Sequence, residues 1–454
     1  MKKQIFGETD GIRVEVGKSP LRPGELVLLA KAARENGFDN RTILFGRDTR
    51  LSGKWIVDEM KGAFEAGKIV DCGVLPTPAL AKLMDDYDNA GAFMVTASHN
   101  PASDNGIKVF EKGTKISDEM ELAIEQDFLA MAPKDANDAD IAAKIEALNA
   151  QSADFSVNED LVEAYALKVN QALNGFDGGT LELALDSASG SGFEFSRRVF
   201  ESFDIKIDQI DNAPTGLNIN EDCGALHPEH LAQKTKELGV MGLALDGDAD
   251  RCILTDEDGR IWNGDRIVVL LAEYLQEKGE LAGNAVVLTE YSNLATVQYL
   301  ESKGIRVLKV VNGDKAVTDL SLKNGLILGG EAAGHILYQP WLDSSDGTFI
   351  ALFVLKILQE KQARLADLWA PYEDKPSLQV QVKVTEKRPL EEIPGFTDAS
   401  ARVEQQMNGE GRVFVRYSGT ENKMRILLEY TDMEQMQAWG EELAQIVRKE
   451  IGND

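Results

Sequence analysis

The sequence predicts an α/β protein with three related α/β domains, whose sheets are mixed or parallel, and a smaller C-terminal α+β domain. Short runs of β-branched and apolar residues alternate with helical patterns, which is typical of parallel sheets covered by helices. The order of strand, small-residue turn and helix occurs three times, whereas the last part has three strand-like runs closed by one helix. At 454 residues the chain is also longer than one hydrophobic core usually covers.

The first predicted domain, residues 1–150, contains three strand-like runs and two helical patterns. The strands are expected at residues 42–46, 69–71 and 92–95, and the helices at 52–68 and 118–130. Acidic residues crowd the first turn of the second helix, where they suit the helix dipole. A segment rich in Ala, Asp, Asn and Ser at residues 132–158 holds the boundary to the next domain.

The remaining predicted domains are residues 151–257, 258–370 and 371–454. In the second domain we expect strands at residues 181–185 and 242–245, with a helix ending near residue 203 between them. In the third we expect a strand at 285–289 and a following helix capped by Ser292. A Pro-containing linker at 370–377 leads to the C-terminal domain, with strands expected at 378–382, 412–416 and 425–429 and a helix at 433–449.

The composition excludes several classes of partner. Lys and Arg number 48 and Asp and Glu 76, so the formal net charge is −28. Such a surface repels nucleic acid and anionic membranes, although a local pocket of basic residues could still bind an anion. The three cysteines are too few and too widely spaced for a disulfide framework or a zinc ribbon. With no apolar leader and no membrane-length apolar run, we expect a cytoplasmic protein.

Three aspartates at alternate positions, Asp246, Asp248 and Asp250, follow an apolar strand in the motif DGDADR. In an extended loop this spacing lets the carboxylates turn toward one point, and a site of oxygen ligands favours Mg²⁺ over Zn²⁺. An EF-hand has the same acidic spacing and would place Glu257 at its twelfth position, but its sixth position needs Gly where Arg251 stands. The residues on either side of the loop are also typical of strands and not of the two helices of an EF-hand. We therefore predict a magnesium site rather than an EF-hand or a solvated turn.

Ser98 lies in the motif TASHNP, directly after a predicted strand. A loop at the carboxyl end of a strand is well placed to react, although alone this motif is more typical of a simple turn. A serine hydroxyl needs a base or a metal to become a nucleophile; His99 and Lys108 are the candidate proton carriers. Gly-x-Ser-x-Gly is absent, and His99 is adjacent in sequence, so a Ser-His-Asp hydrolase fits poorly.

Two further loops suit a sugar phosphate. GGEAAGH at residues 329–335 carries Glu331 and His335, which could bind vicinal hydroxyls, although alone this motif is more typical of a plain turn. RYSGTENK at residues 416–423 places Arg416 at a strand end, before a run with hydroxyls and exposed backbone N–H groups. That combination is typical of a phosphate cradle, with a hairpin turn as the alternative. It is not a P-loop, whose motif is absent from the chain.

In this order, the four motifs resemble those of the α-D-phosphohexomutase family, and the resemblance extends from Phe6 to the C-terminal domain. Several segments are similar to its phosphoglucosamine mutase branch: DNGIK at 104–108, NIN at 218–220, CG at 223–224, HPE at 227–229 and VNGDK at 311–315. The chain departs from the usual motifs at four positions. Glu8 is inserted in FGETDGIR, and Val14 replaces the glycine that usually ends that motif. Lys315 stands where arginine is usual, and Ala333 stands where serine is usual.

The resemblance implies four domains around a central cleft and an isomerase that interconverts glucosamine 6-phosphate and glucosamine 1-phosphate, a step toward UDP-N-acetylglucosamine. It implies that Ser98 carries a phosphoryl group and, with the three aspartates, holds Mg²⁺. The implied partners are a hexose or hexosamine phosphate and its 1,6-bisphosphate, and a homodimer is compatible with this interpretation. The other implied residues are His99, Lys108, Arg13 and Arg251 for catalysis, Glu331, His335 and Lys315 for the sugar, and Arg416, Ser418, Gly419 and Thr420 for phosphate.

Three alternatives remain open at the level of the sequence. A phosphoglucomutase or phosphomannomutase of the same family would have the same serine and metal. A non-catalytic sugar-phosphate sensor would be expected to lose some of Ser98, the aspartates, Lys108 and Arg416, all of which are present. A metal-dependent phosphatase would need water to reach the phosphoserine, and a closing C-terminal domain would exclude that water.

Overall fold

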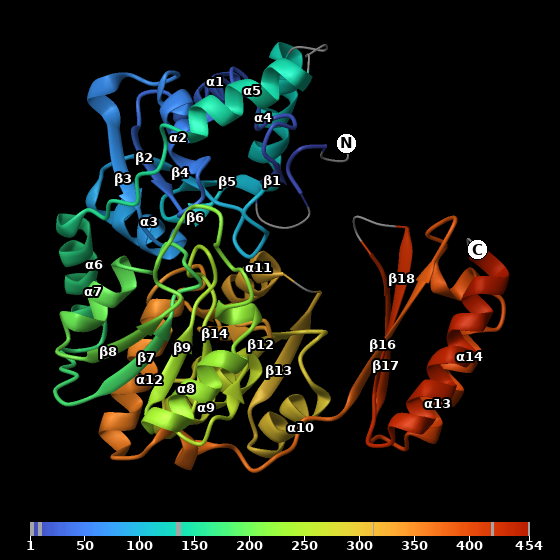
Figure 1. Ribbon diagram of the computed structural model, residues 1–454. Helices are drawn as coiled ribbons and strands as arrows, with labels where there is room; N and C mark the ends of the chain where they lie inside the picture. Colours follow the sequence, from blue (N-terminus) through green and yellow to red (C-terminus); the bar gives the residue numbers. More distant parts are fainter. Residues whose placement is uncertain (1–3, 8–10, 133–137, 312, 419–421, 453–454) are drawn as a thin grey trace.

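The computed structural model describes residues 4–7, 11–132, 138–311, 313–418 and 422–452. It contains four sheets in chain order, which we call the first to fourth modules (Figure 1). The first three are mixed sheets with helices, and the fourth is a three-stranded antiparallel sheet covered by helices on one face. The predicted fold class is therefore confirmed.

The first module has the strand order β1-β5-β4-β2-β3, with β6 paired to β5. Its strands are β1 (Ile12–Glu15), β2 (Thr42–Arg47), β3 (Ile69–Val74), β4 (Ala90–Val95), β5 (Asp104–Glu111) and β6 (Thr114–Lys115). Its helices are α1 (Leu26–Ala33), α2 (Gly53–Lys61), α3 (Thr77–Leu83), α4 (Asp118–Met131) and α5 (Asp138–Asn149). β2, β3 and β4 are parallel, and β4 is buried along its whole length, as its apolar sequence predicts.

Two local predictions are wrong. The helix expected to reach residue 68 ends at Lys61, with Gly62 as its C-cap, and a short 3₁₀ turn then leads into β3. Ser292 does not cap the helix after β12; the Asn293 side chain does, accepting a hydrogen bond from the backbone N–H of Ala295 at 3.0 Å. The segment at 132–158, where we expect the first domain boundary, contains the helix α5.

The second and third modules continue the pattern of strand and helix. The second sheet has the order β11-β10-β9-β7-β8 and the third β13-β12-β14-β15. The second contains α6 (Glu159–Ala172), β7 (Glu182–Asp186), α7 (Phe195–Glu201), β8 (Lys206–Ile210), α8 (Glu229–Leu238), β9 (Met241–Ala244), β10 (Ile253–Thr255) and β11 (Ile261–Trp262). The third contains α9 (Gly264–Lys278), β12 (Ala285–Thr289), α10 (Leu294–Ser302), β13 (Arg306–Val310), α11 (Asp314–Asn324), β14 (Leu328–Gly330), β15 (Ile336–Tyr338) and α12 (Gly347–Lys361). The second sheet thus runs past residue 257, where that domain was expected to end.

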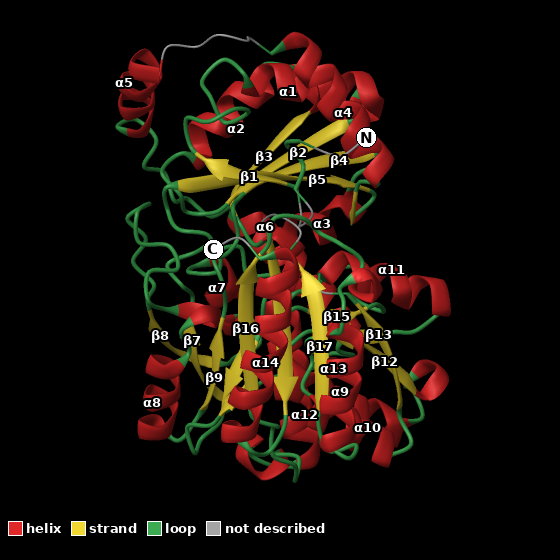
Figure 2. Cartoon of the chain, turned by 90° about the vertical axis from the view of Figure 1, so that its right-hand side faces the viewer, coloured by secondary structure: helices red, strands yellow, loops and turns green. Residues whose placement is uncertain are grey.

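The fourth module has a core of its own. It comprises β16 (Ser377–Lys383), α13 (Phe396–Gln406), β17 (Arg412–Tyr417), β18 (Lys423–Glu429) and α14 (Met433–Ile451). The apolar face of this sheet packs on α13 and α14, whereas one continuous core joins parts of the first three modules. Figure 2 shows the first sheet above the others, with the fourth module in front of the lower part. Within the described part of the chain, no helix is long and apolar enough to cross a membrane.

Candidate active site

The three aspartates lie together in the loop between β9 and β10. Asp246, Asp248 and Asp250 are all buried, and one ligand atom from each lies within 4.8 Å of the others. The Asp248 Oδ1 atom is buried without a hydrogen-bond partner among the described residues. Burial, reinforced by the charges of Asp250 and Asp248, raises the pKa of Asp246 to about 6. Three buried carboxylates with this mutual repulsion are suited to a divalent cation that takes oxygen ligands.

Ser98 meets this loop directly. Its Oγ donates a hydrogen bond to Asp246 Oδ2 at 2.8 Å, although the two residues are far apart in sequence. The residue has φ +51°, a left-handed conformation that is uncommon for residues other than Gly and that holds the hydroxyl on the tight turn after β4. Gly247 allows the close approach, because a Cβ there would lie 2.6 Å from the Ser98 carbonyl oxygen. This contact joins two modules, so it could not be predicted from the sequence alone.

A buried arginine that sequence reasoning did not single out holds the serine loop. Arg50 lies after β2, and its guanidinium donates to four backbone carbonyls of the loop, those of Ser98, Asn100, Pro101 and Asp104. Its Nε pairs with Asp48 Oδ2 at 2.9 Å, and both side chains are fully buried. From the second module, Asn220 Nδ2 donates to the Ser98 carbonyl oxygen at 2.9 Å. These contacts fix the strained serine from two sides.

Lys108 lies between two of the aspartates. It is the fifth residue of β5 and pairs in register with Met94 of β4, which orients its side chain toward the loop after β9. Its Nζ is 2.7 Å from Asp248 Oδ2 and 2.7 Å from Asp250 Oδ2. The charge of Lys108 and then that of His335 lower the pKa of Asp250 well below its usual value, against the opposing effect of burial.

His99 and Arg251 form a second pair beside the serine. The Nη2 atom of Arg251 is 2.8 Å from His99 Nδ1, and Arg251 Nε is 3.6 Å from Asp246 Oδ2. Burial and then the charges of Arg251 and Arg13 lower the pKa of His99 to about 4, so the imidazole is neutral at pH 7. Arg13 comes from β1, which pairs with β5, and its Nε is buried with no partner among the described residues.

The glycine-rich loop packs onto the aspartate loop. His335 lies between two carboxylates, with Nε2 3.0 Å from Asp250 Oδ1 and Nδ1 2.5 Å from Glu331 Oε1. Burial lowers the pKa of His335, but the charge of Asp250 and hydrogen bonds to Asp250 and Glu331 outweigh burial and raise it to about 10. The backbone N–H of Cys252 also donates to the Gly334 carbonyl at 2.9 Å. The aspartates and the Glu331 loop thus form one continuous site.

The other predicted residues lie outside this cluster. Lys315, at the start of α11, pairs with Asp118 of the first module at 2.5 Å, and among the described residues no hydrogen bond or ion pair joins it to Glu331 or His335. Arg416 and Ser418 lie at the end of β17 in the fourth module, where Arg416 contacts Tyr291. Gly419 and Thr420 lie outside the described residues.

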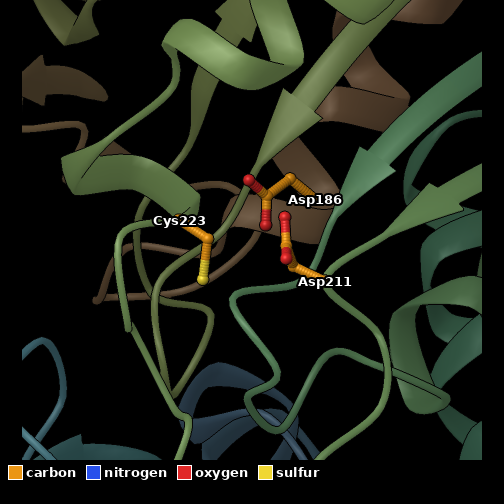
Figure 3. Close-up of side chains that lie close together, drawn as sticks. All are labelled: Asp186, Asp211 and Cys223. Carbon is orange, nitrogen blue, oxygen red and sulfur yellow. The ribbon is translucent and has the colours of Figure 1, made fainter.

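A second group of possible ligands lies in the second module. Figure 3 shows the carboxylates of Asp186 and Asp211 facing each other, with the Cys223 thiol beside them. Asp186 already accepts hydrogen bonds from the backbone N–H groups of Ala188 at 2.9 Å and Gly224 at 2.8 Å. Burial raises the pKa of the Cys223 thiol to about 12, which disfavours the thiolate form that binds metals. We assign this group a structural role in holding two turns.

Comparison with known proteins places this geometry in a family context. The chain matches the phosphoglucomutase/phosphomannomutase descriptions for alpha/beta/alpha domain I at residues 3–134, alpha/beta/alpha domain III at 263–374 and the C-terminal domain at 380–446. It is 35% identical to the phosphoglucosamine mutase of Bdellovibrio bacteriovorus, over 99% of both chains. It is 36% identical to that of Nitratiruptor, over 99% of this chain and 100% of the relative.

Solved structures show the same fold at lower identity. A phosphoglucomutase/phosphomannomutase family protein from Burkholderia thailandensis aligns with a TM-score of 0.73 at 19% identity, covering 98% of this chain and 97% of that one. The Aspergillus fumigatus N-acetylphosphoglucosamine mutase, solved with GlcNAc-6P and magnesium, aligns with a TM-score of 0.66 at 19% identity. That alignment covers 100% of this chain and 96% of the fungal protein.

Proposed function

The chain belongs to the phosphoglucomutase/phosphomannomutase family of phosphohexomutases, and from this premise we propose that it interconverts glucosamine 6-phosphate and glucosamine 1-phosphate. One observation carries the chemistry: the Ser98 hydroxyl donates to Asp246 at 2.8 Å, at the edge of the buried aspartate group. The choice of amino sugar is supported by the curated relatives, which share the name phosphoglucosamine mutase at 34–36% identity over nearly the whole chain.

Magnesium is the cation that the aspartate loop fits best. Its donors are all carboxylate oxygens, they are buried within reach of one another, and Asp248 offers an oxygen that has no other described partner. Asp246, Asp248 and Asp250, with the oxygen on Ser98, would hold the ion. Bound Mg²⁺ would supply positive charge that polarises the transferring phosphoryl group.

The reaction we propose uses a phosphorylated Ser98 in the resting enzyme. The sugar O1 attacks the phosphorus, the bond to the Ser98 Oγ breaks, and a 1,6-bisphosphate forms. The bisphosphate turns over in the site and returns its 6-phosphoryl group to Ser98, which leaves the sugar 1-phosphate. Arg251 and Arg13, whose charges both act on His99, would neutralise the phosphoryl oxygens during each transfer.

Proton transfer has two candidates with different geometry. His99 is neutral at pH 7 and lies 3.4 Å from the Ser98 Oγ through Nδ1, although Arg251 contacts the same nitrogen. Lys108 is buried and donates to two carboxylates as an ammonium group, so it is placed to donate a proton and would have to lose one before it could act as a base. Substitution of each, His99→Gln and Lys108→Met, with pH–rate profiles, would separate their roles.

The remaining residues would bind the substrate. Glu331, with a buried Oε2 that has no described partner, and His335 would hold sugar hydroxyls in both orientations of the bisphosphate. Lys315 would join them by leaving Asp118. The distal phosphate would bind to Arg416, Ser418, Gly419 and Thr420. We also propose the cytoplasm as the compartment, which the buried, unpaired cysteines support.

The experiment is a comparison of three substrates. Purified protein with Mg²⁺ and a trace of the matching 1,6-bisphosphate would receive glucosamine, glucose or mannose 6-phosphate, and phosphorus NMR would follow each 1-phosphate. Fastest turnover of glucosamine 6-phosphate, abolished by Ser98→Ala, is the expected result. Preference for glucose or mannose would keep the mechanism and change the substrate. Absence of turnover with all three, in protein with phosphorylated Ser98, would refute the proposal.

A further inference from the structure

Asp248 is held by a residue of the first module that belongs to none of the motifs found in the sequence. Thr77 is the first residue of α3, two residues after the end of β3, and it is fully buried. Its Oγ1 donates a hydrogen bond to Asp248 Oδ2 at 2.5 Å, and its backbone N–H donates to the Asp248 carbonyl oxygen at 3.0 Å. One residue thus fixes both the side chain and the backbone of Asp248 across the boundary between two modules.

The packing of α3 sets the position of Thr77. Every residue of α3 except Lys82 is buried, and its apolar residues belong to the core that the first three modules share. Pro78 lies in the first turn, where its fixed φ suits the start of a helix. The β-branched side chain of Thr77 has few χ1 rotamers, so its hydroxyl is oriented before any ligand binds.

The two oxygens of the Asp248 carboxylate have different surroundings. Oδ2 accepts from Thr77 Oγ1 and from Lys108 Nζ at 2.7 Å, which accounts for both of its lone pairs. Oδ1 is buried with no hydrogen-bond partner among the described residues. A buried acceptor without a partner costs free energy, and a bound cation would remove that cost. The two donors from the first module therefore leave one oxygen of Asp248 for the ion.

The other two aspartates of the loop are contacted by groups that the proposed reaction uses. Ser98 Oγ donates to Asp246 Oδ2 at 2.8 Å, and His335 Nε2 lies 3.0 Å from Asp250 Oδ1. Substitution of either group would change the chemistry of the site together with the position of a carboxylate. The hydroxyl of Thr77 is neutral and takes part in no step of the proposed reaction. Its removal therefore tests the position of a carboxylate alone.

We propose that Thr77 is a positioning residue for the cation, which acts by holding the Asp248 carboxylate so that Oδ1 stays free to bind the ion. The proposal rests on the proposed function for the assignment of the aspartate loop to magnesium. Without the hydroxyl, the carboxylate could rotate and offer either oxygen to Lys108. The ion would then bind a ligand that is no longer oriented in advance, and its affinity would fall.

The test measures the binding of a metal alone. Mn²⁺, which takes the same oxygen ligands as Mg²⁺, is titrated into the full-length protein, and electron paramagnetic resonance follows the free ion. All preparations have the same phosphorylation of Ser98, checked by intact mass. Thr77→Val keeps the shape of the side chain and removes the donor, so the dissociation constant should rise about 10- to 100-fold. Thr77→Ser keeps the hydroxyl and should restore most of the affinity, which a loss of packing alone would not explain.

Thr348→Val is the matched control. Thr348 is also a buried threonine whose hydroxyl bonds to a side chain of another module, Ser196 at 2.8 Å, but that partner is not a carboxylate of the loop. Its substitution should leave the dissociation constant for Mn²⁺ unchanged. A value for Thr77→Val within about twofold of the unsubstituted protein, or an equal rise in both variants, would overturn the proposal. Should Thr77→Val not fold, as judged by circular dichroism, Thr77→Ala decides by the same criterion.

The same titrations separate this proposal from the proposed function. If the metal affinity depends on Thr77 but no hexose phosphate is turned over, the mutase assignment fails and the role of Thr77 stands. If the protein is an active mutase whose metal affinity is equal with Thr77 or Val, only the role of Thr77 fails. If the unsubstituted protein does not bind the metal, both the magnesium assignment and the role of Thr77 fail.

Discussion

Arg416, the arginine of the predicted phosphate cradle, is held by Tyr291 of another module. The Tyr291 phenol accepts from Arg416 Nε at 2.6 Å, and Phe414 packs edge-on against the same ring, with centroids 5.4 Å apart. A residue of the third module therefore orients a guanidinium of the fourth. This contact couples the position of the fourth module to the direction in which Arg416 points.

Tyr291→Phe should weaken substrate binding while leaving the stacking intact. The variant keeps the ring under Arg416 and loses only the phenol acceptor, a hydrogen bond to a charged donor. We expect KM for the sugar phosphate to rise about fivefold to tenfold, which corresponds to roughly 1 to 1.5 kcal/mol. Tyr299→Phe is the control, because it loses a bond of 2.9 Å to Glu273 away from Arg416. Equal KM values in the two variants would contradict this role.

Removal of one carboxylate from the aspartate loop should abolish most of the activity. Asp248→Asn replaces a carboxylate that has an unpartnered oxygen in the described structure, so the cation loses charge and a ligand. We expect turnover to fall at least about 10²-fold and the Mg²⁺ requirement to shift to higher concentration. A magnesium titration of turnover measures both. Asp211→Asn, in the second acidic group, should leave the titration unchanged; a shift there would mean that this group also binds the cation.

Loss of Arg50 should destabilise the first module. Arg50→Met leaves the fully buried Asp48 carboxylate without its charged partner and frees four loop carbonyls. Breaking such a buried pair costs about 3 to 5 kcal/mol, measurable as a shift in the urea midpoint of that module. Adding Asp48→Asn should restore part of the loss, because it removes the uncompensated charge. Additive effects of the two substitutions would argue against the pair as the cause.

Asp265 predicts a pH dependence of stability. Burial raises its pKa to about 6 from an ordinary 3.8; its Oδ2 accepts from the Asn293 N–H, and its Oδ1 has no partner among the described residues. The pKa of Asp265 is higher in the folded state than in the unfolded state. Its contribution to stability is therefore fully present below about pH 4 and is lost as pH rises through 6. Asp265→Asn cannot ionise and keeps an acceptor for Asn293.

The Asp265→Asn variant should therefore become more stable relative to the unsubstituted protein as pH rises. The difference in free energy of unfolding should grow between pH 4 and pH 8 and reach about 3 kcal/mol in favour of Asp265→Asn. Urea unfolding of both proteins across this range measures it, with Asp319→Asn at an exposed position of α11 as control. A difference that does not change with pH would show that Asp265 is not the titrating group.

The sequence predicted the parts of the site that are local. The three aspartates lie in one loop at alternate positions, and Ser98 directly follows a strand. Both features could therefore be recognised from the local order of residues in the sequence. The alternation of strands and helices likewise predicted the fold class. Two errors, the end of α2 and the capping residue of α10, concern single positions where the sequence offered two plausible residues.

Residues that act across modules could not be found in this way. Arg50 and Asn220 both hold the Ser98 carbonyl, yet Asn220 is separated from it by more than a hundred positions, and no local pattern links them. The segment GRDTR at 46–50 does not by itself indicate this role, because its arginine contacts the serine loop only in the folded protein. Tyr291 is likewise recognisable only through its contact with Arg416. The pairing of Lys315 with Asp118 could not be predicted either, because Asp118 looks like an ordinary surface residue and the sequence assigned Lys315 to the sugar.

The contact between Gly247 and the Ser98 carbonyl has a consequence for how the protein is made. Ser98 comes from the first module, whereas its aspartate partner and Asn220, one of the two residues that donate to its carbonyl, come from the second. A nascent chain that has emerged from the ribosome only as far as residue 240 contains Ser98 but lacks the three aspartates of the site. We therefore expect mutase activity only after the second module has folded against the first. A product truncated before Asp246 would contain Ser98 without the aspartates that would hold the cation, so we expect it to be inactive.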